Sequence, residues 1–331
     1  MTEKRGRTAW ALAVIVPALF LGALLIGRYG VHVGEALCAL FGGADEIVRA
    51  LVLRVRLPRV LAAACVGANL AVTGATFQGI FRNPLVDSRI LGVSAGAAFG
   101  AALALLLSAG PLGLQASAFA FALVAVGLVV LIGLRFGSAP LILVVGGILV
   151  SAFFTALLGL VKYVADPLSS LPAITYWLLG GLSDARWETM VPLLAITGVG
   201  LPFFVAVRWR LNVLTLSDSE AAALGVPVRG LRVAVLGVGT LLVAVSVAVG
   251  GIIGWIGLVV PHVARAWVGP DHGKLIPVSF ALGAGTLLVL DTIARTALPS
   301  EIPLGVLTGL FGVPAFLLLF LRFLRTRGEA R

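Results

Sequence analysis

Side chains that could carry bond-making chemistry are few and scattered in this 331-residue chain. Its three histidines, His32, His262 and His272, are too scattered to predict a metal site. Its two cysteines, Cys38 and Cys65, have no motif spacing, so we expect structural thiols rather than a disulfide framework. The chain has no G-x-x-x-x-G-K-[ST] segment and cannot hold a nucleotide through a P-loop. We therefore expect no catalytic residue, no metal ligand and no cofactor in this chain.

The most informative polar stretch covers residues 214–232, within an otherwise apolar chain. Ser217 and Glu220 form an S-x-x-E capping box, which predicts a short helix that begins at Asp218. Gly225 matches its C-terminal cap, and Pro227 prevents continuation. Because a helix of one or two turns is not stable alone in water, it must pack against something. Two interpretations remain open: a loop helix on the membrane surface, or a docking element for a soluble partner.

The composition indicates that these residues belong to an all-α, polytopic membrane protein. Hydrophobic residues make up 60% of the chain and charged residues only 11%, whereas soluble proteins carry roughly a quarter charged residues. The net charge of +10 does not indicate a nucleic-acid partner, because the basic residues cluster at the ends of the apolar segments. We expect a single membrane domain over residues 1–331, embedded in a lipid bilayer.

About ten spans of usual length are predicted. They cover residues 8–27, 58–80, 90–108, 117–135, 141–161, 189–207, 232–250, 251–268, 275–294 and 303–322. The apolar run from 231 to 260 is too long for one span, and we divide it at Gly250, Gly251 and Gly254. An error in that division would reverse every later orientation.

Basic residues flank the first and last spans and predict that both termini are cytoplasmic. They are Lys4, Arg5 and Arg7 before the first span, and Arg322, Arg325, Arg327 and Arg331 at the end of the last. An even number of spans agrees with this orientation. It places the segment 214–232, between the sixth and seventh spans, in the cytoplasm.

The second span carries two stripes at helical spacing. Its small residues, spaced by four, are Gly67, Ala71, Ala75 and Gly79. Its polar residues are Asn69, Thr73 and Thr76. The small stripe predicts close approach of a neighbouring helix. The polar stripe should face protein or water, so it forms either hydrogen bonds between helices or the wall of a translocation path.

Two further features lie in loops. The Asn83-Pro84 pair predicts a helix break at a membrane interface, which is either a simple turn or a constriction that moves. Several arginines fall on the outer side against the positive-inside tendency: Arg49, Arg54, Arg56, Arg59 and Arg295. They indicate either lipid headgroups or a partner with acidic surface patches, since Arg pairs bidentately with carboxylates.

Six sequence blocks resemble permeases of the FecCD type, a family that includes the membrane subunit of the vitamin B12 importer. The blocks are Arg56-Leu-Pro-Arg59, Phe81-Arg-Asn-Pro-Leu85, Leu91-Gly-Val-Ser-Ala-Gly96, Gly254-Trp-Ile-Gly-Leu-Val-Val-Pro-His262, Asp291-Thr-Ile-Ala-Arg295 and Glu301-Ile-Pro-Leu-Gly-Val-Leu-Thr-Gly309. The resemblance implies a type II ABC importer permease of the bacterial inner membrane, with ten spans and a homodimeric arrangement. It also implies two cytoplasmic ATPase subunits, which bind ATP and Mg²⁺, and a periplasmic substrate-binding protein.

The resemblance also implies roles for individual residues. The ATPase-coupling segment would comprise Ser217, Asp218, Ser219, Glu220, Ala221, Leu224 and Gly225. The residues that dock the binding protein would be Arg56, Arg59 and Arg295. The cytoplasmic gate would comprise Asn83, Pro84 and Leu85, and a second gate is expected near residues 138–141.

The expected cargo is a metal chelate: a ferric siderophore, haem or cobalamin. Import of molybdate or tungstate by a relative of the same architecture is the alternative, compatible with the block at residues 83–87. An ion-coupled secondary carrier and a purely structural scaffold are hypotheses of other classes. The carrier is disfavoured because such proteins usually keep a buried charge, which costs roughly 2.5–3.5 kcal/mol to insert, and the spans hold almost no central charge.

Overall fold

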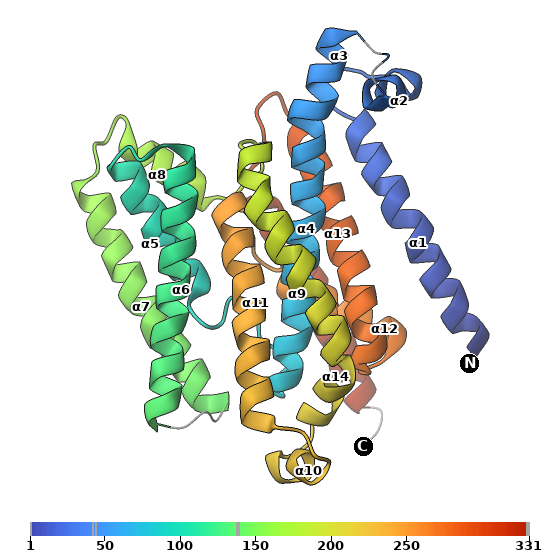
Figure 1. Ribbon diagram of the computed structural model, residues 1–331, viewed down its shortest axis with the longest axis vertical. Coiled ribbons are helices and arrows are strands. Elements are labelled where there is room, and N and C mark those ends of the chain that lie inside the picture. Colours follow the sequence, from blue (N-terminus) through green and yellow to red (C-terminus); the bar gives the residue numbers. More distant parts are fainter. Residues whose placement is uncertain (1, 42, 44, 137–139, 329–331) are drawn as a thin grey trace.

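The computed structural model describes residues 2–41, 43, 45–136 and 140–328 of the chain. All regular secondary structure within these residues is helical. The long helices lie side by side along one direction of the molecule (Figure 1).

The helix bounds are as follows. The first half contains α1 (Thr2–Leu25), α2 (Val33–Phe41), α3 (Glu46–Ala50), the π-helix η1 (Leu51–Arg56), α4 (Leu57–Ile80), α5 (Val93–Leu106), α6 (Gly110–Phe136), α7 (Pro140–Val164) and α8 (Ser170–Leu178). The second half contains α9 (Trp187–Leu214), α10 (Asp218–Ala223), α11 (Val228–Gly250), α12 (Ile256–Val268), α13 (His272–Thr296) and α14 (Leu304–Gly328).

The predicted all-α membrane fold with about ten spans is confirmed. Six helical segments of the described residues are long and apolar enough to cross a membrane, and four shorter apolar helices accompany them. The division of the long apolar run is also correct: α11 ends at Gly250, Gly251 has φ +65°, and α12 begins at Ile256. The short helices α2, α3 and α8 and the π-helix η1 were not predicted, because they add no span-length apolar run.

Helix α4 lies at the centre of the molecule and packs against α9, α11, α12 and α13 (Figure 1). Its small residues permit this packing, as predicted. A Cβ atom on Gly67 would lie 2.2 Å from the carbonyl oxygen of Gly283 in α13. One on Gly74 would lie 1.9 Å from the carbonyl oxygen of Gly257 in α12. Both distances are far below van der Waals contact, so the backbones meet directly.

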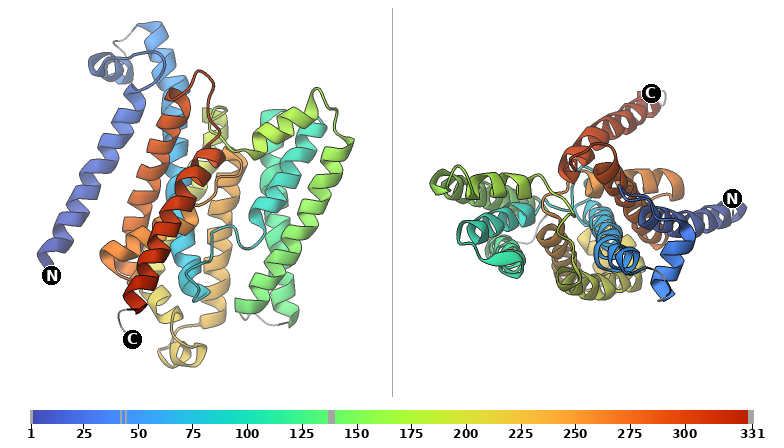
Figure 2. Two further views of the ribbon diagram at one scale, coloured as in Figure 1. Left: turned by 180° about the vertical axis from the view of Figure 1, so that it is seen from behind. Right: turned by 90° about the horizontal axis from the view of Figure 1, so that it is seen from above.

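Helices α5, α6 and α7, with α8 across their end, form a second group that contacts the α4 group mainly through α11 (Figures 1 and 2). Both termini and α10 lie toward one end of the molecule, which we call the α10 end. The opposite end, which carries α2 and α3, is called the α3 end. The relative position of α10 and the two termini agrees with an even number of spans.

Candidate functional site

Helix α10 connects the ends of α9 and α11 at the α10 end (Figure 1). The predicted capping box is present: Ser217 Oγ accepts a hydrogen bond from the Glu220 N–H at 3.3 Å, and Glu220 Oε2 accepts one from the Ser217 N–H at 2.8 Å. The hydrogen bonds from Ser217 lower the pKa of the Glu220 carboxyl. Gly225 adopts φ +75°, in the left-handed region that ends helices. The start and the end of this short helix therefore match the sequence prediction.

One apolar side of α10 is anchored to the bundle. Ala221 and Val226 are buried in a cluster that includes Leu211 and Leu214 of α9. Ala221, one residue of the expected ATPase-coupling segment, is 1% exposed and therefore anchors the helix to the bundle. Ser219 is exposed and Leu224 is 57% exposed. The part of α10 available to a partner is therefore the side that carries these residues.

Asp218, the first residue of α10, is held by two arginines. Arg232 of α11 donates through Nη2 to Oδ1 at 2.9 Å and through Nη1 to Oδ2 at 3.2 Å. Arg82, from the loop after α4, donates through Nη2 to Oδ1 at 3.0 Å. The hydrogen bond from Arg232, together with the charges of Arg232 and Arg82, lowers the pKa of Asp218 despite slight burial, which opposes the shift. Asp218 therefore fixes the first turn of α10 to two other elements.

The loop after α4 is compact and projects at the α10 end. Helix α4 ends at Ile80, and the Asn83 side chain accepts a hydrogen bond from the Leu85 N–H at 2.9 Å, which forms an Asx turn. Asn83, Pro84 and Leu85, the predicted gate residues, are all exposed. The predicted helix break is confirmed, and the gate role remains a prediction. Of the second predicted gate, near residues 138–141, positions 138 and 139 lie outside the described residues, and 140 and 141 begin α7.

A cavity of about 510 Å³ lies beside this loop. Asn83 and Pro84 line one part of it, and Asn212, Arg265 and His272 line another. Asn212 joins the end of α9 to the start of α13, since its amide donates to Asp271 at 2.7 Å and its oxygen accepts from the His272 N–H at 2.8 Å. The hydrogen bond from the Asn212 amide, followed by that from the Gly273 N–H, lowers the pKa of the Asp271 carboxyl, with a smaller contribution from Lys274. The loop therefore borders a cavity that lies between α4, α9, α12 and the start of α13.

The polar stripe of α4 is internal to the protein. Asn69, Thr73 and Thr76 are fully buried. Asn69 donates to Thr197 Oγ1 of α9 at 2.8 Å and to Ser246 Oγ of α11 at 3.2 Å. The expectation that the stripe lines a path is not met in this structure, because neighbouring helices cover all three side chains. Hydrogen bonding between helices is observed for Asn69, whereas the Thr76 hydroxyl donates to the Val72 carbonyl within α4 and Thr73 Oγ1 has no hydrogen-bond partner.

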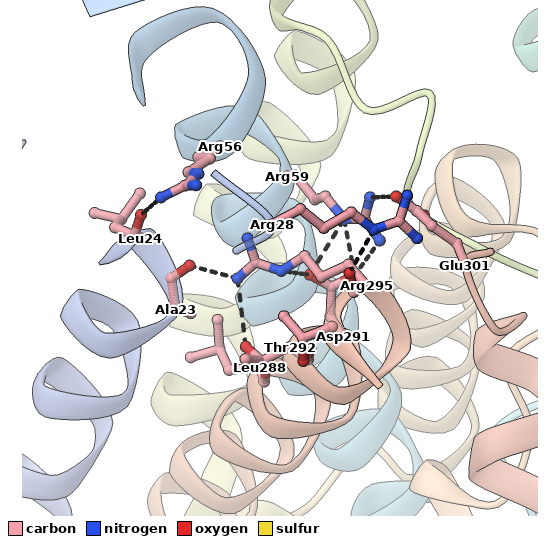
Figure 3. A network of polar contacts seen from close by, with 11 residues as sticks. Ala23, Leu24, Arg28, Arg56, Arg59, Leu288, Asp291, Thr292, Arg295 and Glu301 are labelled. Carbon is pink, nitrogen blue, oxygen red and sulfur yellow. Dashed lines mark hydrogen bonds and ion pairs between the residues drawn. The ribbon is translucent and has the colours of Figure 1, made fainter. Parts of the chain in front are cut away.

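The three arginines expected to dock a partner are buried at the α3 end (Figure 3). Arg59 forms ion pairs with Asp291 and with Glu301, each at 2.9 Å. Arg295 lies 3.5 Å from the same Asp291 carboxylate, one helical turn away in α13. Arg56 donates to the carbonyl oxygens of Leu24 and Leu25 at the end of α1, at 2.8 and 2.9 Å.

The guanidinium groups of these three arginines are therefore engaged within the chain, and their docking role remains a prediction. Arg56, Arg59 and Arg295 are each at most 8% exposed, and their partners belong to this chain. Arginines buried in a low-dielectric environment need such partners, which explains the arrangement. Arg49 and Arg54, which the sequence also places on this side, are exposed. A direct docking role for the buried residues would need these internal contacts to rearrange.

Two acidic residues of this network, Asp291 and Glu301, had no predicted role. Asp291 is 1% exposed and lies between Arg59 and Arg295. The signal that could have found it is the i, i+4 spacing of Asp291 and Arg295 near the end of an apolar segment. The described residues contain no group of three or more His, Cys, Asp or Glu side chains that could hold a metal ion.

Comparisons with known proteins agree over nearly the whole chain. The model of the FecCD transport family matches residues 14–322. The molybdate import system permease protein MolB of Haemophilus influenzae is 39% identical over 315 residues, covering 92% of this chain and 91% of the relative. The hemin transport system permease protein HmuU of Yersinia pestis is 37% identical over 327 residues, covering 93% of this chain and 97% of the relative.

A solved structure has the same fold. It is described as an inward-facing conformation of a metal-chelate type ABC transporter. Its TM-score to this chain is 0.89 at 36% sequence identity, and the match covers 96% of this chain and 99% of that one. The arrangement of helices is thus shared as a whole and not only at the matching sequence blocks.

Proposed function

The chain belongs to the FecCD transport family, and from this premise we propose that it is the membrane-spanning permease subunit of an ABC importer that moves a metal chelate into the cytoplasm. The cargo would be a ferric siderophore, haem or cobalamin. ATP hydrolysis would take place on separate ATPase subunits, in line with the absence of a P-loop from this sequence. The working assembly would contain two copies of this chain, two ATPase subunits and a periplasmic binding protein.

The observation that carries this proposal is the geometry of α10. A six-residue helix with a complete capping box stands at the end of two long apolar helices, α9 and α11, and exposes Leu224. An exposed apolar residue on a short, rigid element suits insertion into a groove of a soluble partner. With α10 and both termini on the cytoplasmic side, that partner would be the ATPase.

The α3 end would then face the periplasm and receive the binding protein. Arg49 and Arg54 supply its accessible positive charge next to η1. The network of Arg56, Arg59 and Arg295 supports this surface from beneath, because it joins α1, α4 and α13. We propose that acidic groups on the binding protein meet the exposed arginines first.

Molybdate is the second candidate cargo, and one specific observation favours it. The relative whose printed name concerns molybdate import matches 92% of this chain at 39% identity. The relative named for hemin transport matches a similar share at 37% identity.

The test is binding-protein-dependent ATP hydrolysis and uptake. The chain would be purified with its co-expressed ATPase, reconstituted in liposomes and given the cognate binding protein loaded with haem, ferric siderophore, cobalamin or molybdate. We expect one cargo to raise the ATPase rate and to accumulate in the liposomes. Light scattering of the purified complex should give two copies of each subunit. Cargo accumulation driven by an ion gradient without ATPase would overturn the proposal and favour the secondary carrier.

A further inference from the structure

The loop after α4 and helix α10 are in direct contact within one chain. Arg82 of this loop donates a hydrogen bond to the carbonyl oxygen of Leu216, the second residue before α10. The same Nη2 atom lies 3.0 Å from the carboxylate of Asp218, the first residue of α10. One side chain therefore links the proposed gate loop to both the entry and the first turn of the proposed coupling helix.

The backbone of the loop holds Arg82 in place. Arg82 has φ +49°, a left-handed conformation that residues other than Gly, Asn and Asp rarely adopt. The Arg82 N–H donates to the Gly79 carbonyl at 3.1 Å, and the Asn83 N–H donates to the Gln78 carbonyl at 3.1 Å. These bonds tie the loop to the last turn of α4, so a displacement of the Arg82 guanidinium would be transmitted to Asn83.

The other side of the contact is equally constrained. The side chain of Arg232, in α11, is 5% exposed and donates hydrogen bonds to both carboxylate oxygens of Asp218. Asp218 therefore cannot move far without moving the start of α11 or losing these bonds. Arg82, 39% exposed, is the more accessible of the two arginines. The Arg82–Asp218 contact can form and break without unpacking the core.

We propose that Arg82 is a positioning residue that couples α10 to the gate loop of the same chain, so that a shift of α10 imposed by the ATPase displaces Asn83, Pro84 and Leu85. This inference rests on the proposed function. Exposed ion pairs contribute little to stability, and each biases an equilibrium by at most about fivefold. The contact is thus suited to shifting a loop between positions rather than to holding the fold together.

The experiment measures cargo transported per ATP hydrolysed in liposomes containing the full complex. The probes are those of the wild-type assay: ferric siderophore, haem, cobalamin and molybdate. We expect Arg82→Gln to lower this ratio about three- to fivefold, the range open to one exposed ion pair. Arg82→Lys, which can keep the ion pair, should retain at least about half of the wild-type ratio. Arg210→Gln is the matched control, because Arg210 is an exposed arginine in the last turns of α9, outside the segment 214–232, and it is not part of the contact.

A double-mutant cycle identifies the partner. If Arg82 acts mainly through Asp218, the effect of Arg82→Gln should become smaller in the Asp218→Asn background, where only the hydrogen bond to the Leu216 carbonyl is left to lose. A wild-type ratio in Arg82→Gln, or an undiminished effect of it beside Asp218→Asn, overturns the inference. If the complex with Asp218→Asn does not assemble, Arg82→Gln is compared with Arg82→Lys instead. An equal loss of cargo transported per ATP in these two variants overturns the inference. If the wild-type complex neither transports nor responds to any probe, the proposed function itself has failed.

Discussion

Two glycines of α4 set the distance between the central helices. Gly74 meets the carbonyl of Gly257 in α12, and Gly67 meets that of Gly283 in α13. In a membrane, where apolar surface gains little from leaving lipid, such close packing is a main source of helix association. The close packing of the central helices therefore depends on glycine at these two positions of α4.

Gly74→Ala is expected to destabilise the protein by about 1–3 kcal/mol, because the added methyl group requires α4 and α12 to move apart. Gly127→Ala is the control: Gly127 lies inside α6, and a Cβ there would meet no heavy atom within 4 Å. The thermal unfolding midpoint of the purified protein in detergent measures both effects. Equal midpoints for the two variants would show that α4 and α12 are not packed as described.

Asp291 is the residue on which the network at the α3 end depends. Asp291→Ala should lower the free energy of unfolding by about 3–5 kcal/mol, because it removes the carboxylate that Arg59 and Arg295 share and leaves both charges buried. Glu301→Ala should cost clearly less, because the Glu301 side chain is 31% exposed and Arg59 keeps Asp291. Thermal unfolding in detergent compares the two. A larger fall in the unfolding midpoint for Glu301→Ala than for Asp291→Ala would show that the network does not depend mainly on Asp291.

Asp218 makes a pH-dependent prediction. Its pKa is lowered below the ordinary value of 3.8, first by the hydrogen bond from Arg232. Its contribution is therefore complete above that ordinary value and is lost only as the pH falls through the lowered pKa. Because Asp218 stays ionised, we expect its titration to cause no change in the ratio of cargo to ATP between pH 7 and pH 5 on the α10 side of the liposomes. A decline over this range in the wild type that Asp218→Asn does not show would contradict the lowered pKa.

At the scale of elements, α10 is a short helix made rigid by its surroundings. An isolated helix of this length would not be stable in water. The capping box, the hydrogen bonds from Arg232 to Asp218 and the burial of Ala221 stabilise it here. The helix can therefore transmit a displacement although it has only six residues. The proposed coupling role depends on this rigidity.

Ala222→Pro should abolish the helix without disturbing the core, because Ala222 is exposed. A proline within a helix costs about 3 kcal/mol, which exceeds the roughly 1 kcal/mol that an N-cap supplies. We expect uptake to fall to a tenth or less of the wild-type rate in reconstituted liposomes. Ala222→Ser is the control and should transport normally. Normal transport by the proline variant would contradict the coupling role of α10.

At the scale of the whole molecule, the two ends expose different elements and side chains to a partner. The α10 end carries a short helix and the loop after α4 (Figure 1), and the α3 end carries the exposed Arg49 and Arg54 and the buried arginine network (Figure 3). Between them, α6 and α7 expose large apolar side chains such as Leu131 and Leu149, which suit contact with lipid. One chain thus combines two different polar ends with an apolar middle.

The exposed arginines provide a test of docking that leaves the buried network intact. Charge reversal of Arg49 and Arg54 together should lower stimulation of the ATPase by the binding protein roughly tenfold, because like charges at an interface are strongly unfavourable. Arg210→Glu, in the last turns of α9 toward the opposite end and outside the segment 214–232, should leave stimulation unchanged. Titration of the binding protein against the ATPase rate in liposomes gives the result. Full stimulation of the double variant would place the docking surface elsewhere.

The features that could be predicted from the sequence are those governed by neighbouring residues. The apolar runs determined the spans, because a bilayer requires a minimum length of apolar helix. Gly250 and Gly251 marked the division between α11 and α12, and Ser217, Glu220 and Gly225 marked the ends of α10, because caps and turns are local structures. The small residues of α4 predicted close packing but not the partner helices.

Only the tertiary structure decided which distant residues meet. Arg59 and Asp291 are separated by most of the chain, and their pairing turned expected surface arginines into a buried network. In the same way α9 and α11 cover Asn69, and Arg82 reaches Asp218 across the α10 end. A side chain's exposure and partners depend on how helices pack, and helical spacing reports only which residues share a face. The sequence by itself therefore determined the elements and the family resemblance, and the packing of those elements determined which polar residues remain available to a partner.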